Sequence, residues 1–238
     1  MQWQDVGFLL SSRSLGESKV IATFLTKEHG VTAAVARVTK KLGHAPYQQG
    51  NSAEITWFGR ISEQLGRWNI EVHDIPSARM MNDQLRILVL SSSCFLIQML
   101  MPERNPCQPT YDALAKLIDQ LDSNLPPIAC YCSFEVQILK HLGFGLDLSK
   151  CAATGTTENL TYISPKTGRA VSKEAGQPYH SQLFPLLPWF SDHSLPLCSQ
   201  DYLKVLQITK HFISTHIIEK YHELPQQREL ITRILADK

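Results

Sequence analysis

Residues 31–60 read VTAAVARVTKKLGHAPYQQGNSAEITWFGR, and this stretch decides how the first third of the chain folds. Two segments rich in β-branched and aromatic residues, Val31–Val38 and Ala53–Phe58, flank a basic loop that glycine and proline interrupt. Alternation at a period of two is the signature of a β-strand with two different faces. In the second segment it separates two sets of side chains: Ala53, Ile55 and Trp57 from Glu54, Thr56 and Phe58.

The loop between these segments is locally cationic. Arg37, Lys40 and Lys41 lie within five positions, and no carboxylate follows them until Glu54. A basic loop held between strands, with aromatic residues nearby, is typical of a surface that binds single-stranded nucleic acid. The alternative from this stretch alone is a solvated hairpin whose lysines serve solubility.

Three further segments with strand character lie on either side of this stretch. Five short strands joined by glycine-containing turns within about 70 residues favour a small closed barrel. Closure removes the exposed edges that so short a β domain would otherwise carry. The expected strands are Val6–Ser12, Ser18–Thr26, Val31–Val38, Asn51–Phe58 and Gly66–Val72.

Beyond Pro76 the pattern changes to helical spacing. Asn82 or Asp83 is suited to cap the first long helix, and Thr110 a later one. Residues 143–198 are irregular, apart from a short hairpin expected between 160–164 and 168–172. The expected helices cover 83–101, 110–123, 127–142, 199–221 and 226–236.

Composition sets limits on the partners and on the compartment. The chain has 238 residues, of which 43% are hydrophobic, so it can bury a core in one large or two small domains. The formal net charge is +1, so affinity for DNA has to come from local clustering of cations. Neither a signal peptide nor an apolar run of about 18 residues is evident. We expect a cytoplasmic, nucleoid-associated protein that does not contact the membrane and keeps its six cysteines reduced.

Motifs of known enzymes and of cysteine-rich metal sites are missing from the sequence. It has no phosphate-binding glycine loop, no nucleophile elbow and no C-x-x-C pair. An enzyme that uses an unrecognised acid/base pair is one alternative, but no compact set of titratable residues indicates it. We therefore predict a protein that is not an enzyme and holds neither a metal nor a cofactor.

An ordered set of motifs along nearly the whole chain resembles the RecO family of bacterial recombination mediators. The N-terminal part is His29-Gly30, followed by the Arg37–Lys41 cluster. The most specific part is Leu142-Gly143-Phe144 and then Tyr162–Ser172, which reads YISPKTGRAVS. The resemblance implies an α+β multidomain protein. An OB-fold barrel would occupy residues 1–78 and a helical domain residues 79–238.

Many members of that family carry a four-cysteine zinc module after the Leu-Gly-[Phe/Tyr] sequence. Here Cys151 stands at the first ligand position, whereas Thr154, Ser172 and Ala175 stand at or near the others. A closed zinc site needs about four ligands. The resemblance therefore implies a zinc-free branch, in which residues 145–198 form a degenerate version of the module.

The resemblance also implies a function without bond chemistry. It implies binding of single- and double-stranded DNA, annealing of complementary strands and engagement of RecR. It further implies docking of the acidic C-terminal tail of single-stranded DNA-binding protein (SSB) and indirect help in loading RecA. The alternative is a protein-binding scaffold with an OB-like barrel and little DNA affinity, which the low net charge favours.

Two sets of residues are candidates for these contacts. The expected phosphate ligands are Arg13, Lys19, Arg37, Lys40, Lys41, Arg60 and Arg67. Tyr47, Trp57, Phe58 and Trp68 are stacking candidates; we assign Trp57 to the core because it shares a face with Ile55, and favour Trp68 because its neighbours are polar. The expected rim of the site for the SSB tail is Arg86, Arg104, Lys116 and Lys140, the few cations of the first three helices.

Overall fold

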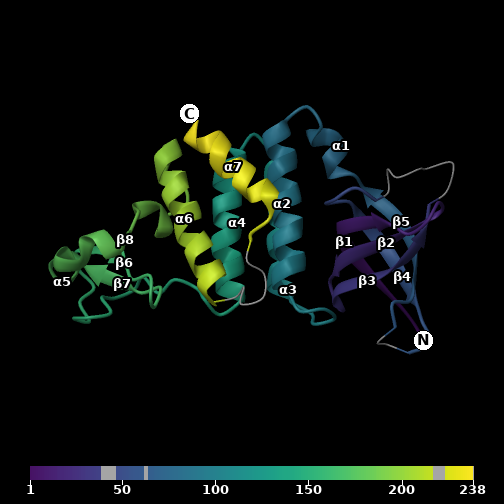
Figure 1. Ribbon diagram of the computed structural model, residues 1–238, viewed down its shortest axis with the longest axis horizontal. Helices are drawn as coiled ribbons and strands as arrows, with labels where there is room; N and C mark the ends of the chain where they lie inside the picture. Colours follow the sequence, from purple (N-terminus) through teal and green to yellow (C-terminus); the bar gives the residue numbers. More distant parts are fainter. Residues whose placement is uncertain (39–46, 62–63, 217–222, 238) are drawn as a thin grey trace. The chain divides into compact units, whose positions relative to one another are not determined.

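The computed structural model describes residues 1–38, 47–61, 64–216 and 223–237 (Figure 1). The chain forms two compact units: Met1–Pro127 with Pro225–Arg228, and Ile128–Leu224 with Glu229–Lys238. The domain boundary expected after residue 78 stays a prediction. In the compact units, the first three helices group with the strands that precede them.

The first unit contains the expected closed barrel, whose strand order is β1-β2-β3-β5-β4. Strands β3 and β5 pair in parallel at a single position, and the other neighbours are antiparallel. This arrangement confirms the OB-fold-like α+β prediction, although β1 is longer at both ends than expected. The strands are β1 Gln2–Ser14, β2 Lys19–Thr26, β3 Gly30–Arg37, β4 Ser52–Phe58 and β5 Arg67–Asp74.

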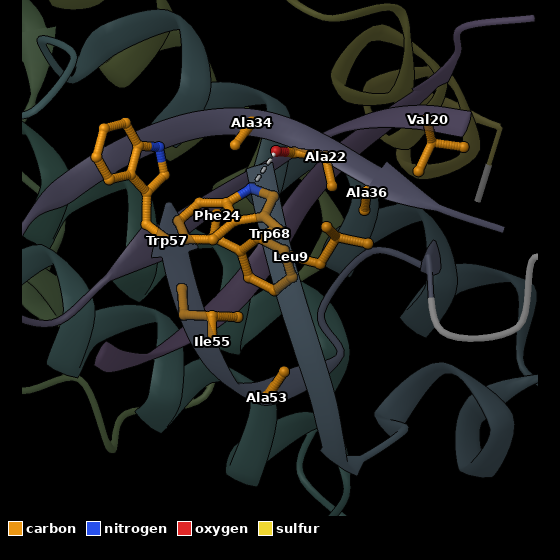
Figure 2. Close-up of a cluster of buried hydrophobic side chains, with 10 residues drawn as sticks. All are labelled: Leu9, Val20, Ala22, Phe24, Ala34, Ala36, Ala53, Ile55, Trp57 and Trp68. Carbon is orange, nitrogen blue, oxygen red and sulfur yellow. Dashed lines mark hydrogen bonds between the residues drawn. The ribbon is translucent and has the colours of Figure 1, made fainter. Parts of the chain in front are cut away.

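Alternating residues of the five strands fill the barrel interior (Figure 2). Trp57 and Trp68 lie directly opposite each other on β4 and β5, and both indoles point inward. The Trp68 Nε1–H donates to the Ala22 carbonyl oxygen at 3.0 Å. Four alanines on the surrounding strands leave room for the two large rings, so the interior packs without a channel.

Helices α1 (Pro76–Met80), α2 (Gln84–Leu100) and α3 (Gln108–Leu121) complete the first unit. Asp83 caps α2 as predicted, because its carboxylate accepts from the backbone N–H groups of the first turn. Helix α3 begins two residues before Thr110, since Pro109 suits the first helical turn.

The second unit is built on α4 (Pro127–His141), α6 (Ser199–His216) and most of α7 (Gln226–Ala236). Helices α4 and α6 lie side by side (Figure 1). The Thr209 hydroxyl of α6 donates to the Glu135 carboxylate of α4, and both side chains are fully buried. Among the described residues, every helix is too short or too polar to cross a membrane.

A small sheet of order β7-β6-β8 lies in the same unit. Strands β6 (Leu160–Ile163) and β7 (Ala170–Ser172) form the expected hairpin. The third strand, β8 (Phe184–Pro185), was not expected because prolines interrupt that segment; it pairs at the free edge of β6. Short helices α5 (Lys173–Gly176), η2 (Gln177–Gln182) and η3 (Pro188–Phe190) surround the sheet.

Candidate nucleic-acid interface

The strand register brings several expected DNA-binding cations together on the outer face of the barrel. Lys19 on β2 pairs directly with Arg37 on β3, while their neighbours Val20 and Ala36 face the core. Side chains alternate along a strand, so the Lys19 and Arg37 side chains both point outward. Both residues are exposed.

A second row of outward positions crosses the barrel next to this pair. Arg13 pairs with Ile21, Ile21 with Val35, and Val35 with Arg67. Neighbouring strands lie about 4.8 Å apart, so Arg13 and Arg67 are separated by three strand spacings, or about 14 Å. The two rows together place four cations over β1, β2, β3 and β5.

The cations of this face lack carboxylate partners. Within the described ranges, no Asp or Glu oxygen lies within 4.0 Å of the charged groups of Arg13, Lys19, Arg37, Arg60 or Arg67. Some other cations are paired; the Arg79 guanidinium, for instance, contacts Asp74 and Asp122. Cations without carboxylate partners are available to replace counterions on a phosphate backbone.

Lys40 and Lys41 lie outside the described residues, so their place relative to this face stays a prediction. Arg37 marks the point where β3 ends before them. On the other side of the loop, the Tyr47 hydroxyl donates to the Arg37 carbonyl oxygen at 2.7 Å. Burial raises the pKa of Tyr47, so the phenol keeps the proton that it donates.

Trp68 does not offer a stacking surface, contrary to the prediction. Its side chain is in the core, with 7% of the residue exposed and the indole N–H already bonded to Ala22. Polar sequence neighbours were a misleading signal, because neighbours on a strand point to the opposite face. The informative signal was the alternation of Trp68 with Ile70 and Val72. The assignment of Trp57 to the core is confirmed, since it is 1% exposed.

Phe58 is the stacking candidate that does reach solvent. It is 36% exposed, and it lies opposite Arg67 on the outer face. Its alternation with Trp57, visible in the sequence, already placed it outside. Phe58, Arg60 and Arg67 line a hollow of about 550 Å³ at this end of β4 and β5.

A second hollow, of about 570 Å³, lies further along the same strands and has the opposite charge. Glu54 and Glu71 pair directly across β4 and β5, and both line it together with Asp5 and Glu28. Lys27 is the cation among its lining residues. Four residues of β4, or about 13 Å, separate Glu54 from Phe58. The outer face is therefore basic at one end of β4 and acidic at the other, which disfavours phosphate at the acidic end.

Two of the four cations expected to read an acidic tail lie apart within the first unit. Arg86 and Arg104 lie beside opposite ends of α2, whose 17 residues are about 25 Å long. Arg86 is bonded to Asp83 and to the Leu121 and Leu125 carbonyl oxygens, so its guanidinium is occupied within the first unit. The Arg104 Nη2 donates to the Gln64 carbonyl oxygen at 2.7 Å. Lys116 on α3 and Lys140 on α4 are exposed, and their part in binding a tail stays a prediction.

The environment of Cys151 was tested for its fit to the zinc that the resemblance implies. Its Sγ accepts from the backbone N–H of Ser172 at 3.2 Å and of Thr154 at 3.5 Å. Burial opposes ionisation of the thiol, but hydrogen bonds from Thr154 and Ser172 outweigh it and lower the pKa of Cys151 to about 6. One thiol surrounded by hydroxyl residues is not the donor set of a closed zinc site. Within the described part of the chain, no three His, Cys, Asp or Glu residues are grouped to hold a metal ion.

The chain is similar to two family models and to individual proteins. A family model described as "Recombination protein O N terminal" matches residues 1–75, and "Recombination protein O C terminal" matches residues 81–225. A protein named DNA repair protein RecO from Caulobacter vibrioides is 37% identical over all of this chain and 98% of its own length. Proteins of the same name from Rhodospirillum centenum and Sinorhizobium medicae are 36% and 34% identical. These matches cover 96% and 92% of this chain, and 92% and 88% of the relatives.

Proposed function

Because the chain belongs to the RecO family of DNA repair proteins, we propose that it acts as a non-catalytic mediator that binds DNA through the outer face of its barrel. The observation that carries this proposal is the cluster of Arg13, Lys19, Arg37 and Arg67. Strand pairing brings these side chains together, and within the described residues no carboxylate pairs with any of them. Such a cluster replaces counterions on phosphate and reads no sequence.

The same proposal covers both single- and double-stranded DNA. A face of cations attracts any phosphate backbone, so two complementary strands are held near one another and anneal faster. We further propose that the protein engages RecR, docks the acidic tail of SSB and thereby helps load RecA. For the tail, Lys116 and Lys140 are the exposed candidates; Arg86 is a weaker one because its guanidinium is occupied.

A protein-binding scaffold with little DNA affinity is the second candidate, and the acidic hollow around Glu54 and Glu71 favours it. Carboxylates facing each other across two strands repel, and a basic segment of a protein partner would relieve that repulsion. The two functions are compatible in one molecule, since the acidic and basic hollows lie about 13 Å apart on β4.

Binding of a fluorescein-labelled oligonucleotide, followed by anisotropy at several salt concentrations, tests the proposal. A DNA-binding mediator gives an affinity that falls steeply and linearly on logarithmic axes as salt rises. It also accelerates annealing of complementary strands. A protein without measurable affinity at low salt is a scaffold, and the proposal is then wrong.

A further inference from the structure

The hollow at the end of β4 and β5 is lined by Met1, Phe58, Gly59, Arg60, Gln64, Gly66 and Arg67. Among the described residues that line the hollow, two are cations and none is an acid. Its volume of about 550 Å³ falls within the range of small-ligand sites. The lining therefore combines an aromatic wall with positive charge.

Phe58 and Arg67 form the wall of this hollow as a direct cross-strand pair. Residues opposite each other in an antiparallel sheet have their β-carbons about 5 Å apart. A base that covers the exposed Phe58 ring thus leaves its own phosphate within reach of the Arg67 guanidinium. Arg60, two residues beyond Phe58, lies on the same hollow and can contact the next phosphate.

The floor of the hollow consists of positions where no side chain fits. A β-carbon on Gly59 would lie 2.2 Å from the Trp57 ring, and one on Gly66 would lie 2.3 Å from Trp57 Nε1. Gly66 also has a φ of +64°, which favours glycine. A side chain at either position would point toward Trp57, so packing against the core requires glycine here, and backbone alone forms this part of the hollow.

The buried indole of Trp57 supplies an independent sign of a ligand. Its Nε1–H has no hydrogen-bond acceptor in the described part of the chain, although Trp57 is 1% exposed. A buried donor left unpaired is destabilising by about 1–3 kcal/mol. Gly66 packs against this N–H and also lines the hollow, so the unpaired donor lies directly beneath the hollow.

We propose that this hollow seats one unpaired nucleotide, with its base stacked on Phe58 and its phosphates held by Arg60 and Arg67. The inference rests on the proposed DNA-binding function and adds a preference to it. A base within a duplex is stacked on its neighbours and paired, so its face is not free to cover Phe58. The hollow thus distinguishes single strands, while the cations on β1, β2 and β3 contact phosphates of either form.

Three labelled probes and one substitution test the proposal. The probes are an oligothymidylate of about 15 nucleotides, an abasic oligomer of equal length and charge, and a duplex. Stacking on an aromatic side chain contributes about 1–3 kcal/mol per base, so Phe58→Ala should weaken oligothymidylate binding roughly tenfold. Binding of the abasic oligomer and the duplex should change less than about twofold, because phosphate contacts are retained.

Two variants keep the result interpretable. Phe58→Leu retains an apolar side chain without an aromatic face, and we expect most of the loss to persist. Ile61→Ala removes an exposed apolar side chain of the same loop and should leave binding of all three probes unchanged. Both positions are exposed, so thermal unfolding should confirm that the variants are folded.

Several results would overturn the inference. Equal losses for all three probes, or none for oligothymidylate, would show that no base stacks on Phe58. Full affinity in Phe58→Leu would point to simple apolar contact, as with the apolar end of an acidic peptide. In each of these cases, if DNA binding by the wild type still depends on salt, the proposed function is retained. A wild-type protein that binds no probe would refute both.

Discussion

Replacing Arg13, Lys19 and Arg37 together with alanine tests the DNA-binding face most directly. Each phosphate contact on a single strand contributes about 0.7 to the slope of log affinity against log salt, so losing three contacts should lower the slope by about 2. Over a fourfold rise in salt, from about 50 to about 200 mM, the wild type should therefore lose about 16-fold more affinity than the variant.

The same variant should leave folding almost unchanged. All three side chains are exposed, and in the described ranges no carboxylate pairs with them. Surface substitutions of this kind usually change the free energy of unfolding by less than about 0.5 kcal/mol. A large drop in thermal stability would mean that these cations stabilise the barrel, and the affinity measurement would then need single substitutions.

The matched control is Lys150→Ala/Lys166→Ala/Lys173→Ala. These residues are exposed in the second unit, and their loss changes the net charge by the same amount. Fluorescence anisotropy of a labelled single strand, titrated at a series of salt concentrations, gives the slope for each protein. Equal slopes in the wild type and the barrel variant would refute the assignment of the face. An equal reduction in the control would show that total charge, and not this surface, governs binding.

Three further predictions concern stability, and a fourth concerns zinc. Because the pKa of Cys151 falls to about 6 from an ordinary value of about 9, its thiolate contributes stability that is lost as pH falls through 6. Between pH 6 and pH 8 the wild type should gain about 1–2 kcal/mol relative to Cys151→Ala in denaturant unfolding, because the folded state holds the thiolate more strongly than the unfolded chain does. Thr209→Val should cost about 1–3 kcal/mol, since it removes the hydroxyl that donates to the buried Glu135 carboxylate, and no loss would contradict the hydrogen bond. Gly66→Ala should destabilise more than Gly16→Ala: both have positive φ, but only the first collides with the core, as thermal melts would show. Elemental analysis should find no stoichiometric zinc, and chelators should leave the melting temperature unchanged; about one zinc per chain would contradict the ligand argument.

The barrel could be predicted from the sequence because its strands alternate clearly and its turns contain glycine. Periodicity also separated Trp57 from Phe58, one residue apart and on opposite faces. Trp68 was placed wrongly because its immediate neighbours were weighed in place of residues two positions away. In a strand, the residues at i±2 report the environment of a side chain, and for Trp68 these include Ile70.

The rows of cations could not be predicted from one sequence. Arg13, Lys19 and Arg37 are adjacent only through the register of β1, β2 and β3, and a shift of one residue would turn each of them inward. The parallel contact of β3 with β5 adds Arg67 from a strand 30 residues later. Helical spacing likewise identified Arg86 and Arg104 as cations near α2 but did not show that they lie at its opposite ends.

The division of charge on the barrel would allow a protein of net charge +1 to bind DNA as proposed. Its long-range field is weak, so we expect little electrostatic steering and an association rate that depends only modestly on salt. The salt dependence of affinity should then appear mainly in dissociation, because contacts with Lys19, Arg37 and Arg67 form only after the strand has reached the face. The carboxylates of Glu54 and Glu71 would repel phosphate from the far end of β4, so we expect a bound strand to follow a path that begins over β1–β3 and ends at Phe58. Low net charge, which favoured a scaffold from the sequence alone, is therefore compatible with the proposed DNA binding, because positive and negative side chains are separated on the barrel.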